Sequence, residues 1–535
     1  MNRARLFVFA AASGVAVLAA GCGTTVTGVT GASGVAGTAS EGSLAGPAAT
    51  APADSGLLAP AAPGGAGGGS AGSGGVGTTG GSGSTGPVGG AGRPAAGSAG
   101  AGGAGSGAGL PTGVPGKGVT ATRIYVGITY TTKGDAANAA LGASSITEGD
   151  QRADAQAVID DINAHGGVAG RKLTPVWYAY DVTDNRPYAV QDAAACAKFN
   201  QDSHIFAALG NGLSDNYVAC NTKAGAIDLG AEIIGPDQAY FRQFPYYFDY
   251  GTLSQDRMMA DEVRVLQRLH YFTGWSAVTG GPASTPVKLG IIGYDTPNWT
   301  TPLRHVMLPA LARAGHPVAT ADVQLIQYPQ DNSQIAPAVA QIQSAVLKFR
   351  QDNVSHVIVL DANGSMMLQL LQNARGQRYY PRFGVNTATG IEALATTGAV
   401  STKQFNGAVG LGWSPTLDLP SGKDDQYLGP ATTYCIKTVE KRTGQHFDST
   451  NAAAIALGYC DGLYLLRDVI NRAGSVLNQQ TARASLEALG AAFKPASMAA
   501  AYFSPSRHDG LQVGYDLVWN NACSCTRYVG QHNIP

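Results

Sequence analysis

The sequence predicts an α/β protein built from two doubly wound α/β lobes. From residue 119 onward, short β-branched runs alternate with amphipathic helical segments. This alternation is typical of a mainly parallel sheet that is covered by helices on both faces. It runs through one series of elements and then through a second, which indicates two lobes.

The first series begins with a buried strand at Arg123–Thr129. A helix is expected after Thr147, which forms a capping-box-like pair with Asp150. The apolar residues of this helix share one face, and the glycines of residues 163–167 predict its end, because glycine adopts the left-handed terminal turn easily. The other expected elements are strand 173–180, helix 188–199, and strands 204–209 and 225–233 with a short helix between them.

The second series repeats this pattern. Helices are expected at 256–272, 300–314, 335–349 and 366–374, and strands at 287–294, 318–325, 356–360 and 382–385. Two helices after Tyr427 and Asn451 and a strand at 513–519 follow both series. Because these segments can belong to either lobe, we expect the chain to cross between the lobes several times.

The N-terminal residues predict an exported lipoprotein. Arg3 and Arg5 precede an apolar run that ends at Ala20 and is too short to span a bilayer, as in a signal peptide. Leu18-Ala-Ala-Gly-Cys22 resembles a bacterial lipobox, so residues 1–22 are expected to be a lipoprotein signal peptide, with Cys22 as the lipidation site. An ordinary signal peptide with a chance cysteine is the alternative.

Residues 23–118 predict a disordered tether. This stretch consists mainly of Gly, Ala, Ser, Thr, Pro and Val and has no aromatic residue, so it cannot bury enough apolar surface to fold. As a flexible coil of ~95 residues it reaches about 50–60 Å, which would hold the folded part away from a membrane. A low-complexity insertion without this role is the alternative.

Charge and motifs exclude several functions. The 35 basic and 36 acidic residues give a net charge of -1, which offers no footprint for nucleic acid or for an anionic membrane surface. The metalloprotease, nucleophile-elbow and phosphate-loop motifs do not occur. We therefore expect no catalytic residues, no metal and no cofactor.

Several phrases resemble the branched-chain amino-acid-binding family of periplasmic binding proteins. The most specific are Ile124-Tyr-Val-Gly-Ile128 and Asn163-Ala-His-Gly-Gly-Val-Ala-Gly-Arg-Lys-Leu173. Weaker echoes follow in the same order at 207–216, 241–245, 289–295 and 451–472. The resemblance covers most of residues 119–535.

This resemblance implies a type I periplasmic binding protein fold with a three-crossing hinge. Lobe 1 would comprise 119–253 and 388–500, and lobe 2 would comprise 254–387 and 501–535. The implied function is to close on a small solute and deliver it to an ABC permease outside the cytoplasm.

In the family, hydroxyls and backbone N–H groups of the first lobe hold the ligand's carboxylate, as a helix N-terminus holds an anion. The corresponding residues here are Asn211, Gly212, Ser214, Asp215, Gly230, Ala231 and Glu232. Ser214 is a donor to the ligand in one interpretation and a helix cap in the other. Asp215 and Glu232 oppose an anion.

On the second lobe, the family places an aromatic residue after the strand that ends at Tyr294. Asp295 and Trp299 follow it here, and Trp299 is either a wall of the ligand site or part of the core. An acidic residue that receives an ammonium group is expected near Asp361 and Asn363. Asp361 is alternatively a turn or helix-capping residue.

The acidic residues Asp215, Glu232 and Asp361 favour a cationic or polyol-like ligand over a simple α-amino acid. A lipid-tethered sensor or a partner-binding regulator with the same fold is the main alternative function. A hydrolase is a more distant one.

Six cysteines follow the lipobox and fit an oxidising compartment. Although 15 connectivities are open, the predicted helices favour Cys196 with Cys220 and Cys435 with Cys460. Cys523 and Cys525 are the remaining pair. Metal binding by this pair is disfavoured, because two thiolates alone do not make a tetrahedral zinc site.

Overall fold

The computed structural model describes residues 115–140, 147–230, 235–474 and 476–535. The predicted signal peptide with its lipidation site Cys22, nearly all of the predicted tether, and Ala231 and Glu232 lie outside these residues. Within the described part of the chain, no helix combines the length and the apolarity needed to cross a membrane.

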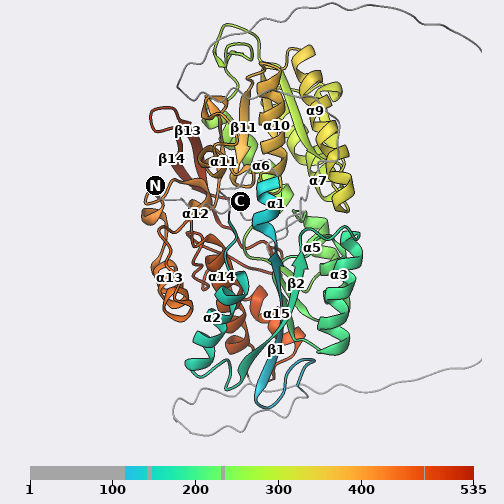
Figure 1. Cartoon of the computed structure of the whole chain (residues 1–535), viewed down its shortest axis with the longest axis vertical. Helices are drawn as coiled ribbons and strands as arrows, with labels where there is room; N and C mark the ends of the chain where they lie inside the picture. The colour runs from blue at the N-terminus through green and yellow to red at the C-terminus, as the bar shows by residue number, and fades with distance from the viewer. Residues whose placement is uncertain (1–114, 141–146, 231–234, 475) are drawn as a thin grey trace, which may run out of the picture. The chain divides into compact units, whose positions relative to one another are not determined.

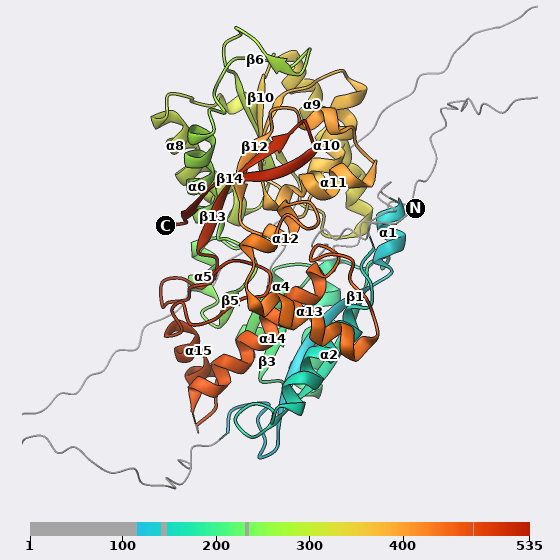
Figure 2. The ribbon, with the colours of Figure 1, turned by 90° about the vertical axis from the view of Figure 1, so that its left-hand side faces the viewer.

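The first sheet has five strands in the order β2-β1-β3-β4-β5, and every neighbouring pair is parallel (Figure 1). The strands are β1 (Arg123–Thr132), β2 (Lys172–Asp181), β3 (Ala207–Leu209), β4 (Ile227–Gly230) and β5 (Tyr247–Asp249). The helices between them are α1 (Gly134–Ala140), α2 (Gln151–Ala164), α3 (Tyr188–Cys196), α4 (Asn216–Lys223) and α5 (Gln238–Gln243). Three later helices complete this half, namely α13 (Pro430–Thr443), α14 (Ala454–Ala473) and α15 (Gln479–Glu487). Figure 2 shows α13, α14 and α15 beside the strands of this sheet.

The second sheet has seven strands in the order β14-β13-β12-β11-β10-β8-β9. Five are parallel, namely β8 (Leu289–Tyr294), β9 (Val323–Ile326), β10 (His356–Val359), β11 (Arg382–Asn386) and β12 (Val409–Gly412). β13 (Val513–Asn520) and β14 (Cys525–Asn533) extend the sheet as an antiparallel hairpin. A separate small ribbon consists of β6 (Trp275–Ser276) and β7 (Gly281–Pro282).

The helices of the second half begin with α6 (Gln255–Arg268) and α7 (Pro297–Pro302). The others are α8 (Leu308–Arg313), α9 (Ile335–Gln351), α10 (Ser365–Gly376), α11 (Ile391–Thr397) and α12 (Pro415–Asp418). A π-helical turn joins α7 to α8, so the single helix expected at 300–314 is three consecutive segments. The expected capping pair of Thr147 with Asp150 is wrong: Asp150 itself is the N-cap of α2, and its carboxylate accepts from the Ala153 N–H at 2.9 Å.

The chain passes between the two sheets three times within one compact unit. The crossings lie between β5 and α6, between β12 and α13, and between α15 and β13. The first and third run side by side, because the Asp249 N–H donates to the His508 carbonyl at 2.9 Å and the Gly510 N–H to the Asp249 carbonyl at 2.7 Å. The observed topology therefore has the three crossings that the resemblance implied.

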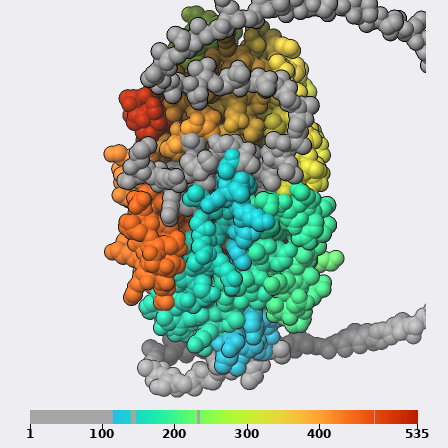
Figure 3. Space-filling view, in the orientation of Figure 1, coloured from blue at the N-terminus to red at the C-terminus, as the bar shows by residue number. Residues whose placement is uncertain are grey.

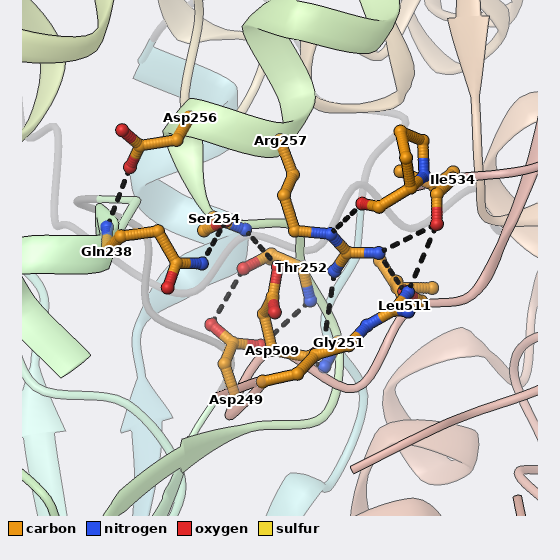
Figure 4. Close-up of polar contacts among 12 residues, drawn as sticks. Gln238, Asp249, Gly251, Thr252, Ser254, Asp256, Arg257, Asp509, Leu511 and Ile534 are labelled. Atoms are coloured by element: carbon orange, nitrogen blue, oxygen red, sulfur yellow. Dashed lines mark hydrogen bonds and ion pairs between the residues drawn. The ribbon is translucent and has the colours of Figure 1, made fainter. Parts of the chain in front are cut away.

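A buried ion pair fastens these two crossings (Figure 4). The fully buried Asp509 accepts from the Ser254 N–H at 2.8 Å and from Arg257 Nη1 at 2.6 Å. Arg257 also donates to the carbonyls of Leu511 and Pro535, each at 2.8 Å. One guanidinium at the start of α6 thus binds the third crossing and the C-terminal residue.

The strand pairing differs from the lobe boundary that we expected at residue 388, where the chain was predicted to return to lobe 1. β12 pairs with β11 in the second sheet, and Ile391 and Leu394 lie in the core of that half. Residues 388–412 therefore pack with the second sheet, although we expected them in lobe 1. Conversely, Ala501 and Phe503 pack in the core of the first half. How far each lobe extends as a moving unit stays a prediction.

The disulfide pairs are those expected. Cys196–Cys220 joins α3 to α4, Cys435–Cys460 joins α13 to α14, and Cys523–Cys525 lies in the turn between β13 and β14. In the last bond the two sulfurs are joined to each other, so neither Cys523 nor Cys525 offers a thiolate ligand.

Replacing Cys435 and Cys460 together by alanine is expected to lower the free energy of unfolding by about 3 kcal/mol. These residues are 25 apart in the sequence, and closing a loop of this size removes substantial chain entropy from the unfolded state. Urea unfolding of the oxidised full chain measures the change. The matched control replaces Cys523 and Cys525, which are only two residues apart; an equal loss there would contradict the chain-entropy explanation.

Candidate functional site

The carboxyl ends of the parallel strands in the second sheet carry several predicted ligand-binding residues. Tyr294 ends β8, Trp299 lies in α7, and Asp361 follows β10. The Tyr294 and Trp299 rings meet edge to face with centroids 5.7 Å apart, and the Tyr294 hydroxyl donates to Asp361 Oδ1 at 3.4 Å. The structure brings these three residues together; their contact with a ligand stays a prediction.

Two pockets flank this cluster. One, which we call the crossing pocket, has a volume of about 310 Å³, including the open solvent at its mouth. Its lining includes Trp299, Asp361, Asn386, Trp413, Thr252 and Gly235. The other, the helix pocket, has a volume of about 640 Å³, including its mouth, and lies between α9 and α10. Tyr294 and Asn363 line the helix pocket.

Asp361 is held by the start of α10. Its carboxylate accepts from the backbone N–H groups of Ala362 at 2.7 Å, Asn363 at 3.3 Å and Met367 at 2.8 Å. Burial raises the pKa of Asp361, although these donors oppose the shift. Because both oxygens already accept hydrogen bonds, the structure favours the capping interpretation over a direct role in receiving an ammonium group.

The predicted carboxylate-binding turn of the first lobe is occupied by a carboxylate of the protein itself. The buried Asp192, from α3, accepts from the Leu213 N–H at 3.0 Å and from the Ser214 N–H at 2.8 Å. It also accepts from the Ser214 hydroxyl at 2.6 Å and the Tyr180 hydroxyl at 2.7 Å. The single hydroxyl proton of Ser214 is therefore already donated to Asp192. Its weak 3.4 Å contact with the Asn216 N–H is the only sign of capping in the described residues.

The remaining predicted residues lie elsewhere. Neither pocket is lined by Asn211, Gly212, Ser214, Asp215 or Gly230. Gly212 is a packing residue, because a β-carbon there would lie 2.2 Å from the Tyr217 side chain. Asp215 and Asp295 are exposed.

Sequence reasoning missed most of the residues that line the pockets, among them the aromatic and amide side chains of Tyr188, Tyr328, Asn386 and Trp413. Asn386 and Trp413 lie at or just beyond the carboxyl ends of β11 and β12, where ligands bind in parallel α/β sheets. Recognising β12 would have pointed to Trp413. Tyr188 begins a helix of the first half, and no sequence signal places it against the second.

The chain is similar to solved structures of solute-binding proteins. A possible leucine/isoleucine/valine-binding protein from Rhodopirellula baltica is 16% identical, with a TM-score of 0.53, and the match covers 77% of this chain and 97% of that one. A fatty acid ABC transporter substrate-binding protein from Thermomonospora curvata is 16% identical, with a TM-score of 0.52 and coverage of 79% and 97%. A branched-chain amino acid transporter substrate-binding protein from Streptococcus pneumoniae, solved with isoleucine, is 15% identical, with a TM-score of 0.50 and coverage of 77% and 99%.

At these identities the likeness concerns the fold. No protein-family model matches the chain, and no curated protein matches its sequence.

Proposed function

Because the chain has the fold of the type I periplasmic binding proteins, we propose that it is a solute-binding protein that captures a small ligand between its two lobes and catalyses no reaction. The observation that supports this most is the helix pocket. It lies beside the carboxyl ends of second-sheet strands, yet Tyr188 of the first half forms part of its wall. A ligand there would contact both halves.

The mechanism that fits is closure of the two lobes around the ligand. Direct hydrogen bonds already join the halves beside the helix pocket. Tyr188 donates its N–H to the Gln330 carbonyl at 2.8 Å and its hydroxyl to Asn332 Oδ1 at 3.1 Å. Asn332 Nδ2 donates to the carbonyls of Asp184 at 2.9 Å and Val182 at 3.2 Å. Figure 3 shows the surface around α9 meeting that around α3. A ligand that contacts both halves stabilises the closed state over the open one, which shifts the population.

We further propose that the protein works outside the cytoplasm as a lipoprotein, acylated at Cys22 and tethered by residues 23–118. Disulfides between helices support an oxidising compartment. An ABC permease is the proposed partner; the Thermomonospora curvata protein with the same fold is named as an ABC transporter substrate-binding protein.

Thermal unfolding of the full chain against a library of small solutes tests this function. A ligand at 100 times its dissociation constant adds about 2.7 kcal/mol to the stability of the folded state, so one chemical class is expected to raise Tm by a few degrees. The control is the same library with the urea-unfolded chain, which should bind nothing. A library without a single stabilising solute would contradict solute capture and favour the sensor or regulator function.

A further inference from the structure

The wall of the helix pocket is apolar. It is formed by Ile326, Ala338, Val339, Ile342, Met366 and Leu368, among others. Among the described residues that line it, there is no Lys, Arg, Asp or Glu. A charged group that entered this pocket would lose its hydration without meeting a counter-charge among the described lining residues, which is unfavourable. The wall therefore selects an uncharged, largely apolar molecule.

Polar groups are present on one side of the same pocket. Asn363, Ser365 and Gln369 line it, and all three lie in or directly before α10. Asn363 Oδ1 accepts from the Ser365 N–H and hydroxyl. Within the described residues, Asn363 Nδ2 and the side-chain amide of Gln369 have no hydrogen-bond partner. These amide N–H groups suit a carbonyl or hydroxyl oxygen of a ligand.

Aromatic rings complete the pocket and connect it to the first half. Tyr294 and Tyr328 meet edge to face with centroids 5.1 Å apart. Tyr188 is the lining residue from the first half, and its bonds to Gln330 and Asn332 fix it against the second. Separation of the halves would break these bonds and withdraw the Tyr188 ring from the pocket.

The groups that would anchor an amino acid are already engaged. Asp192 takes the donors of the Ser214 turn, and backbone N–H groups take the carboxylate of Asp361. A ligand with a free carboxylate and ammonium would therefore find neither partner at these positions.

We propose that the helix pocket holds an uncharged ligand with an apolar body and an oxygen-bearing polar end, and that Tyr188 is its lid. This rests on the proposed solute-binding function and specifies the class of solute. It replaces the cationic or polyol-like ligand that the acidic residues of the sequence favoured.

Fluorescence titration of the full chain with N-phenyl-1-naphthylamine, an uncharged apolar probe, tests the site. We expect the emission to rise on binding, and Ala338→Phe, which fills the pocket, to weaken binding at least tenfold. The matched control is Ala340→Phe on the same helix, because Ala340 is exposed and does not line the pocket. If Ala338→Phe does not fold by circular dichroism, Val339→Phe at the half-buried neighbouring wall position takes its place.

Further measurements distinguish the role of Tyr188 as a lid from the role of the pocket wall. They also distinguish a failure of the proposed ligand class from a failure of the solute-binding function. Tyr188→Ala should speed dissociation of the probe several-fold. Equal affinities of the Ala338→Phe and Ala340→Phe variants, or displacement of the probe by leucine or lysine, would overturn the proposed ligand class. If charged solutes raise Tm while the probe does not bind, the ligand class fails and the solute-binding function stands. If neither the probe nor any solute binds, both fail.

Discussion

Replacing Arg257 by methionine is expected to lower the free energy of unfolding by about 3–5 kcal/mol. The substitution leaves the fully buried Asp509 carboxylate without its cation, and breaking one side of a buried ion pair has this cost. It also removes donors from the carbonyls of Leu511 and Pro535. Urea unfolding of the full chain, extrapolated to water, measures the loss.

The control for this variant is Arg264→Met, further along the same helix. Arg264 is about half exposed, and its nearest acidic atom, on Asp261, is 3.9 Å away, so a change within about 0.5 kcal/mol is expected. Adding Asp509→Asn to Arg257→Met should recover part of the loss, because the unpaired charge is then gone. Failure to recover would assign the loss to the carbonyls that Arg257 binds.

The ion pair of Arg257 with Asp509 also shows which features of the fold sequence patterns can predict and which they cannot. Strands such as β1, β8 and β10 were predictable because buried parallel strands are continuous apolar runs. The pairing of Arg257 with Asp509 was not, because 252 residues separate them. The topology brings them together only after the chain has crossed back to the first sheet and entered its third crossing.

Five strands were not predicted, namely β5, β6, β7, β12 and β14, and two of them, β12 and β14, were missed for different reasons. β12 has only four residues, and two of them are glycines, which weaken a strand signal. β14 is a hairpin partner at the edge of the sheet, and most of its side chains are exposed or half-buried. Because β12 was not predicted, the sequence analysis placed the lobe boundary at residue 388 and did not identify Trp413 as a pocket residue.

The family resemblance pointed to Tyr294, Trp299 and Asp361, and the topology does bring these residues together at the carboxyl ends of the second-sheet strands. That a ligand binds there stays a prediction, and the chemistry of the site was not predictable. Whether a hydroxyl or carboxylate is available to a ligand depends on partners in space. Ser214 and Asp361 fit a ligand site by their place in the sequence, yet their bonding capacity is used inside the protein.

The carboxylate of Asp192 makes this point testable. Replacing Asp192 by alanine is expected to lower the free energy of unfolding by about 3–5 kcal/mol, because four donors from Tyr180, Leu213 and Ser214 lose their acceptor in a buried place. The matched control is Asp154→Ala. Asp154 is also buried, but it accepts a single side-chain bond, from Gln445, and burial raises its pKa to about 7, so a smaller loss is expected.

Formate distinguishes an anion site from a merely structural carboxylate. The cavity left in Asp192→Ala has the size of the lost carboxyl group and keeps its donors, so added formate should raise the Tm of this variant by several degrees and leave that of Asp154→Ala unchanged. An equal response of the two variants would mean that the donors re-pair with one another. If formate does bind, the Ser214 turn can hold an anion. In the unmodified protein, the Asp192 carboxylate then occupies the position that a ligand carboxylate would need. Asp192 would then exclude a ligand carboxylate from the Ser214 turn, whereas specificity for an uncharged ligand in the helix pocket rests on the apolar wall of that pocket.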